Sequence, residues 1–213
     1  MTLNDLFSRS LGVAHLRQRR LSEYLGNHEW ELDLEAGVCD FGKGRVHAVS
    51  IIGSESEQTE TWRWARANRS IPQHLVCPMP HALEIAEAHD IREFLDPGFS
   101  LEIADGHTVS MIVAAHEGFP YYRGPYDGGA LFFGLKIDSI QEQPLTAFEV
   151  QKSLLETFDT YERFDHRQMV AGFSELLHCP LKDHGQWTTL SIGNELVELT
   201  FDKRNRLLAL TMP

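Results

Sequence analysis

The chain has few of the features that mark exported or membrane-embedded proteins. Its 213 residues include three cysteines, Cys39, Cys77 and Cys179, which lie far apart and leave an odd thiol. Such a set does not form the disulfide framework of a small secreted protein, so we expect reduced thiols and a cytoplasmic location. The longest apolar run, residues 109–115, is far shorter than the roughly 20 residues that cross a bilayer. The first 20 residues also lack the continuous apolar segment of a signal peptide.

Basic residues are scarce as well. The sequence has 19 Lys and Arg against 31 Asp and Glu, a formal net charge of −12 at pH 7. Because Lys and Arg must displace counterions from phosphates, this balance argues against nucleic acid as a partner. It favours a protein partner with a basic surface if the carboxylates gather on one face. Arg9, Arg17 and Arg20 cluster along the first predicted helix, and we interpret them as a solvated helix face.

Short signatures of catalysis and of phosphate binding do not occur in the sequence. There is no Gly-x-Ser-x-Gly nucleophile elbow, and no glycine-rich loop ends in the Lys-Ser/Thr of a P-loop. The glycine-rich residues 124–129 have the composition of a hairpin turn instead. We therefore favour a protein that is not an enzyme, leave activity open, and expect no cofactor.

One loop carries side chains that can ligate zinc. His74, Cys77 and His81 supply two imidazoles and a thiolate just before a predicted helix. The segment lacks the Cys-x-x-Cys or His-Glu-x-x-His spacing that makes such an assignment specific. We predict no metal site, and these three residues are the candidates if one exists.

The apolar residues alternate between two periods along the chain. A period of three to four predicts helices at residues 3–25, 80–95, 105–117, 147–161 and 166–178. A period of two predicts strands at residues 30–35, 38–41, 46–52, 59–67, 121–123, 130–137, 187–192, 197–201 and 208–212. The short connections between successive strands favour antiparallel meanders and hairpins over parallel crossovers.

These elements predict an α+β fold with antiparallel sheets packed on several helices. The helix at residues 105–117 is apolar nearly all round, so we expect it in the centre of the molecule. We interpret residues 1–213 as a single compact domain. A helix precedes antiparallel strands at each end of the chain, which leaves a weak internal duplication open.

Two helix starts have the spacing of a capping box. Thr146 is followed three residues later by Glu149, and Asp165 by Gln168. In this device each side chain satisfies a backbone amide that the first helical turn leaves unpaired. The spacing predicts helices that begin directly after Thr146 and Asp165.

The most distinctive string is residues 61–68, which read Thr-Trp-Arg-Trp-Ala-Arg-Ala-Asn. On a strand, Trp62 and Trp64 share one face and Arg63 points to the other. Two adjacent indoles form a flat wall that suits an aromatic or apolar ligand. The alternative is that they cover the central helix as core, which is the commoner role of tryptophan pairs and the interpretation we favour.

The same string resembles an uncharacterised bacterial family of unknown function with a Thr-Trp-x-Trp-Ala-x-Ala-Asn motif after a meander of strands. The turn at Arg206 and Leu207 is similar to the C-terminal pattern of that family, and the likeness spans most of the chain. Proteins similar to this one often have an aromatic residue between Ala65 and Ala67, where this chain has Arg66. The resemblance implies a shared fold and carries no activity.

Two classes of function remain. The first is a binding or interaction protein without catalysis, for instance an immunity-type protein whose acidic surface covers a basic target. The second is a small-molecule-binding domain or enzyme with an aromatic-lined pocket, walled by tryptophan and tyrosine and anchored by arginine. Its candidate ligand-binding residues are Trp62, Arg63, Trp64, Arg66, Asn68, Tyr121, Tyr122 and Arg123. The oligomeric state is left open.

Overall fold

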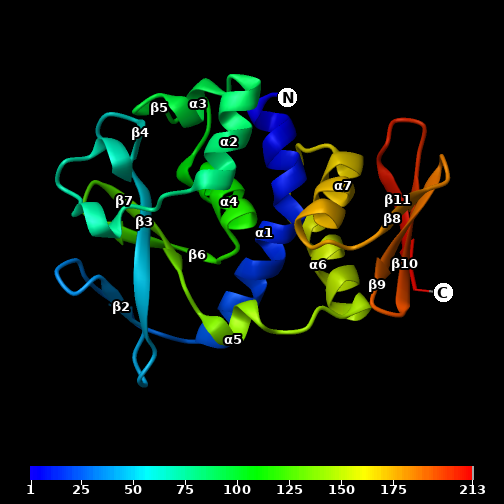
Figure 1. Ribbon diagram of the computed structural model, residues 1–213, viewed down its shortest axis with the longest axis horizontal. Coiled ribbons are helices and arrows are strands. Elements are labelled where there is room, and N and C mark those ends of the chain that lie inside the picture. The colour runs from blue at the N-terminus through cyan, green and yellow to red at the C-terminus, as the bar shows by residue number, and fades with distance from the viewer. Residues whose placement is uncertain (213) are drawn as a thin grey trace.

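The computed structural model describes residues 1–212, which form helices and antiparallel sheets as the sequence predicts (Figure 1). The helices are α1 (Leu3–Leu25), α2 (Pro80–His89), α3 (Arg92–Leu95), α4 (Gly106–Glu117), α5 (Asp138–Gln141), α6 (Ala147–Thr160) and α7 (His166–Leu176). None of these helices combines the length and the apolar character that a membrane crossing requires.

The strands form two separate sheets. The seven-stranded sheet contains β1 (Glu31–Asp33), β2 (Val38–Asp40), β3 (Val46–Ser56), β4 (Thr61–Trp64), β5 (Gly98–Ser100), β6 (Tyr121–Tyr126) and β7 (Gly129–Leu135). The four-stranded sheet contains β8 (Leu181–Asp183), β9 (Trp187–Ile192), β10 (Glu195–Phe201) and β11 (Leu207–Thr211). The neighbouring strands pair antiparallel, which confirms the predicted fold class.

Strand β3 joins the parts of the larger sheet. Its first residues pair with β2, and its last residues pair with β4 on one side and β7 on the other. The register against β7 shifts between Ile51 and Gly53, where the strand has one extra residue. Such a bulge bends a strand, so β3 can follow both parts of a curled sheet. Strand β6 pairs with β7 and lies at an edge of this sheet.

The helices fill the space between the two sheets. Figure 1 shows the larger sheet at one end of the long axis, the smaller sheet at the other, and α1 in the middle. Helix α1 packs against α4, α6 and α7. Its crossing with α7 is close: a Cβ atom on Gly172 would lie 1.9 Å from the carbonyl oxygen of Arg9. Glycine at residue 172 therefore allows the two helix backbones to touch.

The predicted central helix is α4, and the prediction is confirmed. The Asp105 side chain accepts a hydrogen bond from the Thr108 amide at 2.7 Å, which begins the helix, and Gly118 ends it in the left-handed region. All seven side chains of residues 109–115 are buried. The helix is buried on several sides because it lies between α1 and the larger sheet.

The structure differs from the sequence prediction around the tryptophan string. The strand predicted at residues 59–67 ends at Trp64, and Ala65–Ala67 form a 3₁₀ turn. The single helix predicted at residues 80–95 is two helices, because Asp90 adopts a left-handed conformation after α2. Strand β5 was not predicted, and its three residues pair with β4. A strand this short leaves almost no period to detect in a sequence.

Candidate functional site

A cleft of about 480 Å³ opens beside α1, between α4, β6 and the C-terminal end of α6. Polar and aromatic side chains make up most of its lining. Its lining residues are His15, Gln18, Arg19, Ser22, His107, Met111, Tyr121, Glu156, Thr160 and Tyr161. One of them, Tyr121, belongs to the ligand-binding set that the sequence predicts.

Helix α1 fixes the backbone at Tyr121. As an edge strand, β6 has amide and carbonyl groups that face away from β7. The Tyr121 amide donates to Gln18 Oε1 at 2.9 Å, and Gln18 Nε2 donates back to the Tyr121 carbonyl oxygen at 2.9 Å. This paired contact satisfies both backbone groups, so Gln18 holds the buried tyrosine at a defined position in the cleft.

A histidine from the first turn of α4 meets the Tyr121 hydroxyl. The hydroxyl and His107 Nδ1 share a hydrogen bond of 2.8 Å, and His107 itself is exposed at the mouth of the cleft. Burial raises the pKa of Tyr121 well above its ordinary value, and the nearby Tyr161 and Asp105 raise it further. The phenol therefore keeps its proton at neutral pH and remains a hydrogen-bonding group without charge.

Tyr161 faces the cleft from the end of α6. Its hydroxyl lies 3.7 Å from the sulfur of Met111, and its ring packs edge-on against His15 with the centroids 6.1 Å apart. Burial raises the pKa of Tyr161 too, and Asp105 adds to the shift. A thioether is a weak hydrogen-bond acceptor, so this hydroxyl has a stronger interaction to offer an entering ligand.

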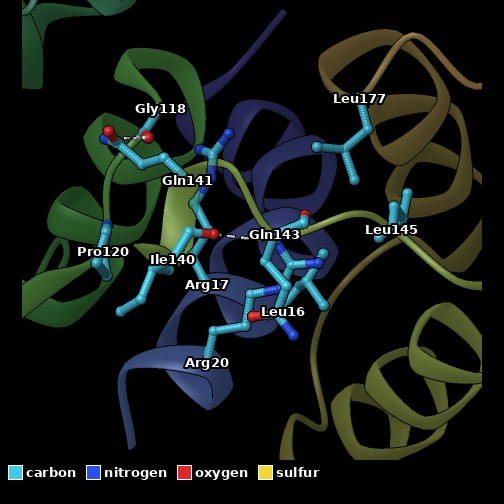
Figure 2. Close-up of a pocket in the computed structure, with 10 residues that line it drawn as sticks. All are labelled: Leu16, Arg17, Arg20, Gly118, Pro120, Ile140, Gln141, Gln143, Leu145 and Leu177. Atoms are coloured by element: carbon cyan, nitrogen blue, oxygen red, sulfur yellow. Dashed lines mark hydrogen bonds between the residues drawn. The ribbon is translucent and has the colours of Figure 1, made fainter. Parts of the chain in front are cut away.

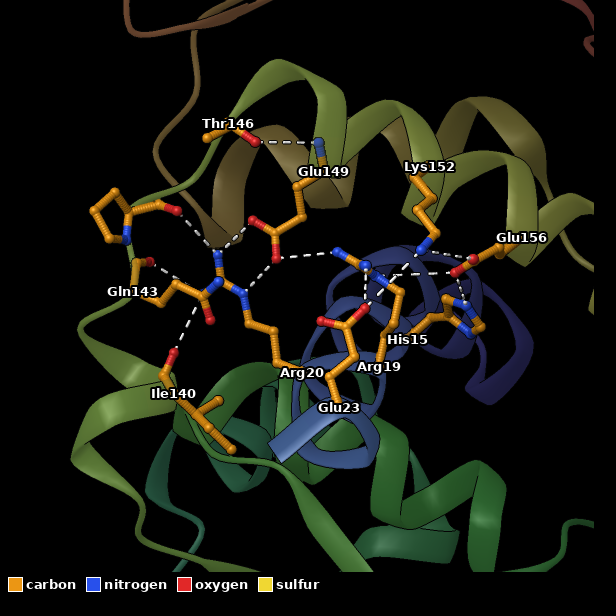
Figure 3. A network of polar contacts seen from close by, with 11 residues as sticks. His15, Arg19, Arg20, Glu23, Ile140, Gln143, Thr146, Glu149, Lys152 and Glu156 are labelled. Atoms are coloured by element: carbon orange, nitrogen blue, oxygen red, sulfur yellow. Dashed lines mark hydrogen bonds and ion pairs between the residues drawn. The ribbon is translucent and has the colours of Figure 1, made fainter. Parts of the chain in front are cut away.

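The charged side chains at the cleft are paired with one another (Figure 3). His15 Nε2 lies 3.5 Å from Glu156, which also lies near Lys152 at 3.8 Å. Arg19 contacts Glu23 at 2.7 Å. Burial lowers the pKa of His15, and the hydrogen bond and charge of Glu156 offset this only in part. His15 is therefore neutral at neutral pH, like the two tyrosines.

A buried ion pair joins α1 to α6 behind the cleft (Figure 3). Arg20 donates from Nε and Nη2 to the two oxygens of Glu149, both at 2.7 Å. Its other donors reach the carbonyl oxygens of Ile140, Gln143 and Pro144. Glu149 also contacts Arg19 at 3.1 Å. We call Arg20 and Glu149 the clasp.

The contacts of Glu149 and of the arginines on α1 correct two sequence predictions. The Thr146 hydroxyl accepts from the Glu149 amide at 3.2 Å, but the Glu149 side chain pairs with Arg20, so this capping box is half formed. The prediction that Arg9, Arg17 and Arg20 form a solvated face is wrong. Arg9 pairs with Glu175, Arg17 donates to carbonyl oxygens at the end of α4, and Arg20 is buried. Residue type did not reveal these roles because the partners lie about 100 or more positions away in the chain.

Trp62 and Trp64 lie in the core. Both side chains are fully buried, and their rings meet edge to face with centroids 5.3 Å apart. Trp64 Nε1 donates to the Glu93 carbonyl oxygen at 2.8 Å. The Trp62 ring packs on Phe132 of β7 and on Phe99 of β5. Neighbouring elements thus fill the space in front of the indole wall.

The three polar candidates around the tryptophans serve the local backbone. Arg63 donates to the Ala67 carbonyl oxygen at 3.0 Å on the far side of β4. Arg66 donates to the carbonyl oxygen of Asp96 at 3.2 Å, and its guanidinium lies over the Trp64 ring. Asn68 accepts from the Ser70 amide at 3.1 Å.

The remaining candidates on β6 diverge from Tyr121. Tyr122 alternates to the other face of the strand, where its hydroxyl shares a 3.1 Å hydrogen bond with His28 Nε2. Arg123 lies 3.9 Å from Glu55. The eight predicted ligand-binding residues therefore do not converge on one site, and Tyr121 alone of them lines the cleft.

The three zinc candidates also have separate surroundings and do not form one group. His74 is exposed, whereas Cys77 is buried and its pKa is raised by that burial. His81 lies at the start of α2, and its Nδ1 atom is 3.0 Å from Glu117 at the end of α4. Across residues 1–212, no three His, Cys, Asp or Glu side chains come together in a way that could hold a metal ion.

No sequence pattern indicates most of the cleft. His15, His107, Tyr121 and Tyr161 lie far apart in the chain, and no short pattern links them. Tyr161 continues the apolar stripe of α6, so its spacing indicates packing. Only the packing of α1 against α4 and α6 brings these residues together.

The fold and the cleft define an α+β protein with two antiparallel sheets and a small concave site beside a central helix. Residues 4–137 match the family of unknown function DUF6882, and the chain belongs to this family. The matched part runs from α1 through β7, so the tryptophan string lies inside it and the turn at Arg206 outside it. Searches of curated proteins and of solved structures give no match.

Proposed function

We propose that this protein binds a small, planar, uncharged molecule in the cleft between Tyr121 and Tyr161. The size of the cleft carries the first step. Its volume of about 480 Å³ falls within the range of roughly 300–1,000 Å³ that is usual for small-molecule sites. The rings of His15, His107 and both tyrosines line it, and such surfaces favour flat ligands.

The electrostatics of the cleft favour an uncharged ligand. The hydroxyl groups of Tyr121 and Tyr161 keep their protons because burial raises both pKa values, and burial keeps His15 neutral. The formal charges of Arg19 and Glu156 are shared with other charged side chains. A charged ligand would lose hydration without gaining a free counter-charge.

The same pKa shifts favour binding over catalysis. A general base works best with a pKa near the working pH, and a tyrosine whose pKa is raised moves away from that range. The Tyr121 and His107 pair is suited to donating and accepting hydrogen bonds with a ligand held against it. The observation that carries the proposal is this convergence of neutral polar groups on an aromatic-lined cleft.

The proposal is tested by thermal-shift titration with matched probes. Nicotinamide, adenine and uracil are uncharged planar rings, and nicotinate is the anionic counterpart of nicotinamide. We expect at least one uncharged ring to raise the melting temperature saturably, and nicotinate to raise it less than nicotinamide. Tyr161→Phe should abolish the shift, whereas Tyr126→Phe, an exposed tyrosine elsewhere on β6, should not. Equal shifts in both variants would contradict the proposal.

A second candidate function is docking of a protein with a basic surface. The hairpin of β1 and β2 concentrates exposed carboxylates at one end of the molecule. They are Glu29, Glu31, Asp33, Glu35 and Asp40. Charge of one sign on a projecting hairpin increases the association rate of a basic partner and makes it salt-dependent. Titration with a lysine-rich peptide, followed by NMR, should perturb the amides of this hairpin at low salt; perturbations spread evenly over the surface would argue against it.

A further inference from the structure

A second cavity lies on the other side of α1 from the cleft, at the C-terminal end of α4 (Figure 2). Its volume is about 170 Å³, room for roughly five water molecules at their volume in the liquid. Its lining residues are Leu16, Arg17, Arg20, Gly118, Pro120, Ile140, Gln141, Gln143, Leu145 and Leu177. None of them lines the cleft, so the two sites are separate.

Arg17 is the unusual residue of this cavity. Its Nη1 group donates to the carbonyl oxygens of Ala114 and Ala115, the latter at 2.7 Å. Its Nε and Nη2 groups donate to no other residue among the 212 that are described. No carboxylate in that part of the chain lies within ion-pair distance of it. Arg17 is half-buried and borders the cavity without a carboxylate partner, which calls for an explanation.

The surroundings of Arg17 increase the need for a counter-charge. Burial and, to a smaller extent, the charge of Arg20 lower the pKa of Arg17 to about 10. The guanidinium is still charged at neutral pH. Arg20 cannot help to bind an anion, because Glu149 and three backbone carbonyls already occupy it.

The rest of the cavity wall is largely apolar. Leu16, Leu145 and Leu177 are half-buried or buried leucines from α1, the loop before α6 and the end of α7. The Nε2 group of Gln141 is already engaged, because it donates to the Gly118 carbonyl oxygen at 3.0 Å. The cavity thus offers one cationic end and an aliphatic body.

We propose that this cavity binds a short-chain carboxylate. Its head group would accept from the unused Nε and Nη2 donors of Arg17, since a guanidinium presents donors at the spacing of two carboxylate oxygens. Its aliphatic chain would lie against the leucines. A role of Arg17 limited to capping α4 accounts for the Nη1 contacts and leaves the other donors and the adjoining cavity unexplained.

Calorimetric titration of the full chain separates these roles. The probes are butanoate, its uncharged analogue butanamide, and inorganic phosphate, all at one ionic strength set with sodium chloride. We expect saturable binding of butanoate and at least about tenfold weaker binding of the other two, because one lacks the charge and the other the aliphatic chain. Equal affinity for butanoate and butanamide would overturn the proposal. Tighter binding of phosphate would overturn the assignment to a carboxylate.

Two variants locate the binding. Arg17→Met should abolish the butanoate signal, but it also removes the contact to α4 and so tests stability at the same time. Leu177→Phe fills the cavity and leaves the Arg17 contacts in place, so it should abolish binding while the fold is kept. Leu155→Phe, at an exposed leucine on α6, is the matched control and should bind as the parent does. Unchanged butanoate binding by Leu177→Phe would show that the anion binds elsewhere, and it would contradict the proposal. Tyr161→Phe should leave this signal unchanged, because Tyr161 does not line the cavity. The proposals for the cavity and for the cleft are therefore tested separately.

Discussion

Two groups of aromatic side chains in this molecule differ in their surroundings. Trp62 and Trp64 are adjacent on one strand face and completely buried. Tyr121 and Tyr161 come from distant segments, and both line an open cleft. The difference lies in what covers them: β5, α3 and β7 pack directly on the indoles, whereas α1 passes beside the tyrosines without filling the space between them.

This contrast shows that a row of large rings on a strand is not by itself a binding platform. The indoles are core residues because β5, α3 and β7, from later parts of the chain, pack on them. Tyr121 is itself buried, with its hydroxyl bonded to His107, whereas Tyr161 is half-buried, with its hydroxyl near the sulfur of Met111. The packing of neighbouring elements, and not the hydrogen bonding of the rings, therefore separates the filled aromatic cluster from the one beside the cleft, since the buried Trp62 Nε1 has no hydrogen-bond partner among the described residues.

The largest expected effect is the loss of stability when a buried tryptophan is removed. Trp62→Ala removes a fully buried indole and should lower the free energy of unfolding by about 3–5 kcal/mol. Trp187→Ala, at a tryptophan that is 38% exposed, should change it by only about 0.5 kcal/mol. Urea denaturation measures both. Equal, small losses in the two variants would mean that Trp62 is not a core residue.

The clasp holds the segment that carries Tyr161 against α1. Glu149→Gln removes the charge that Arg20 and Arg19 share, and we expect a loss of about 3 kcal/mol because the buried Arg20 loses its carboxylate, whereas Arg19 keeps Glu23. The exposed neighbour variant Lys152→Met should change stability by less than about 1 kcal/mol. The double variant Arg20→Met with Glu149→Leu should recover part of the loss. A double variant less stable than Glu149→Gln would contradict this account.

Acid should lower the stability of the fold through His116, near the end of α4. Burial lowers the pKa of His116 from 6.5 to about 4. Below pH 6.5 the unfolded chain takes up a proton that the folded chain refuses, so stability is complete above that pH and falls as the pH decreases. The loss should reach about 2 kcal/mol by pH 5. His116→Gln should flatten the pH dependence of urea denaturation between pH 6.5 and 4; an unchanged profile would exclude this histidine as its source.

The smallest expected effect concerns the support of Tyr121. Gln18→Leu leaves the Tyr121 amide and carbonyl without their partner at the edge of β6, which should lower stability by about 1 kcal/mol. Gln151→Leu, a half-buried glutamine on α6, serves as the control. We also expect Gln18→Leu to weaken nicotinamide binding in the thermal-shift titration. Unchanged binding would show that Tyr121 does not need this support.

Local physics made much of the fold predictable. The cap at Asp105 and the glycine at residue 118 marked the ends of α4, and the alternation along β10 marked a terminal hairpin. The interruption of the helix at Asp90 was missed, because a left-handed aspartate has no distinctive sequence pattern. Strand β5 was missed because it is too short to show a period.

The candidate site was predictable at one residue only. Tyr121 was named because it stands beside other aromatic and basic residues in the sequence, and that same reasoning grouped it with Tyr122, which faces the other way. The polar character of Gln18 gave no hint that it holds an edge strand. Such roles follow from which helices touch, and periodicity fixes the buried face of a helix without naming its partner.

Methionine-methyl NMR of the full chain with nicotinamide tests the central claim most directly. Met111 lines the cleft, whereas Met79 and Met169 are buried away from it. The account predicts that the Met111 methyl signal shifts saturably during the titration while those of Met79 and Met169 stay in place. A Met111 signal that does not move while another methionine responds would contradict it.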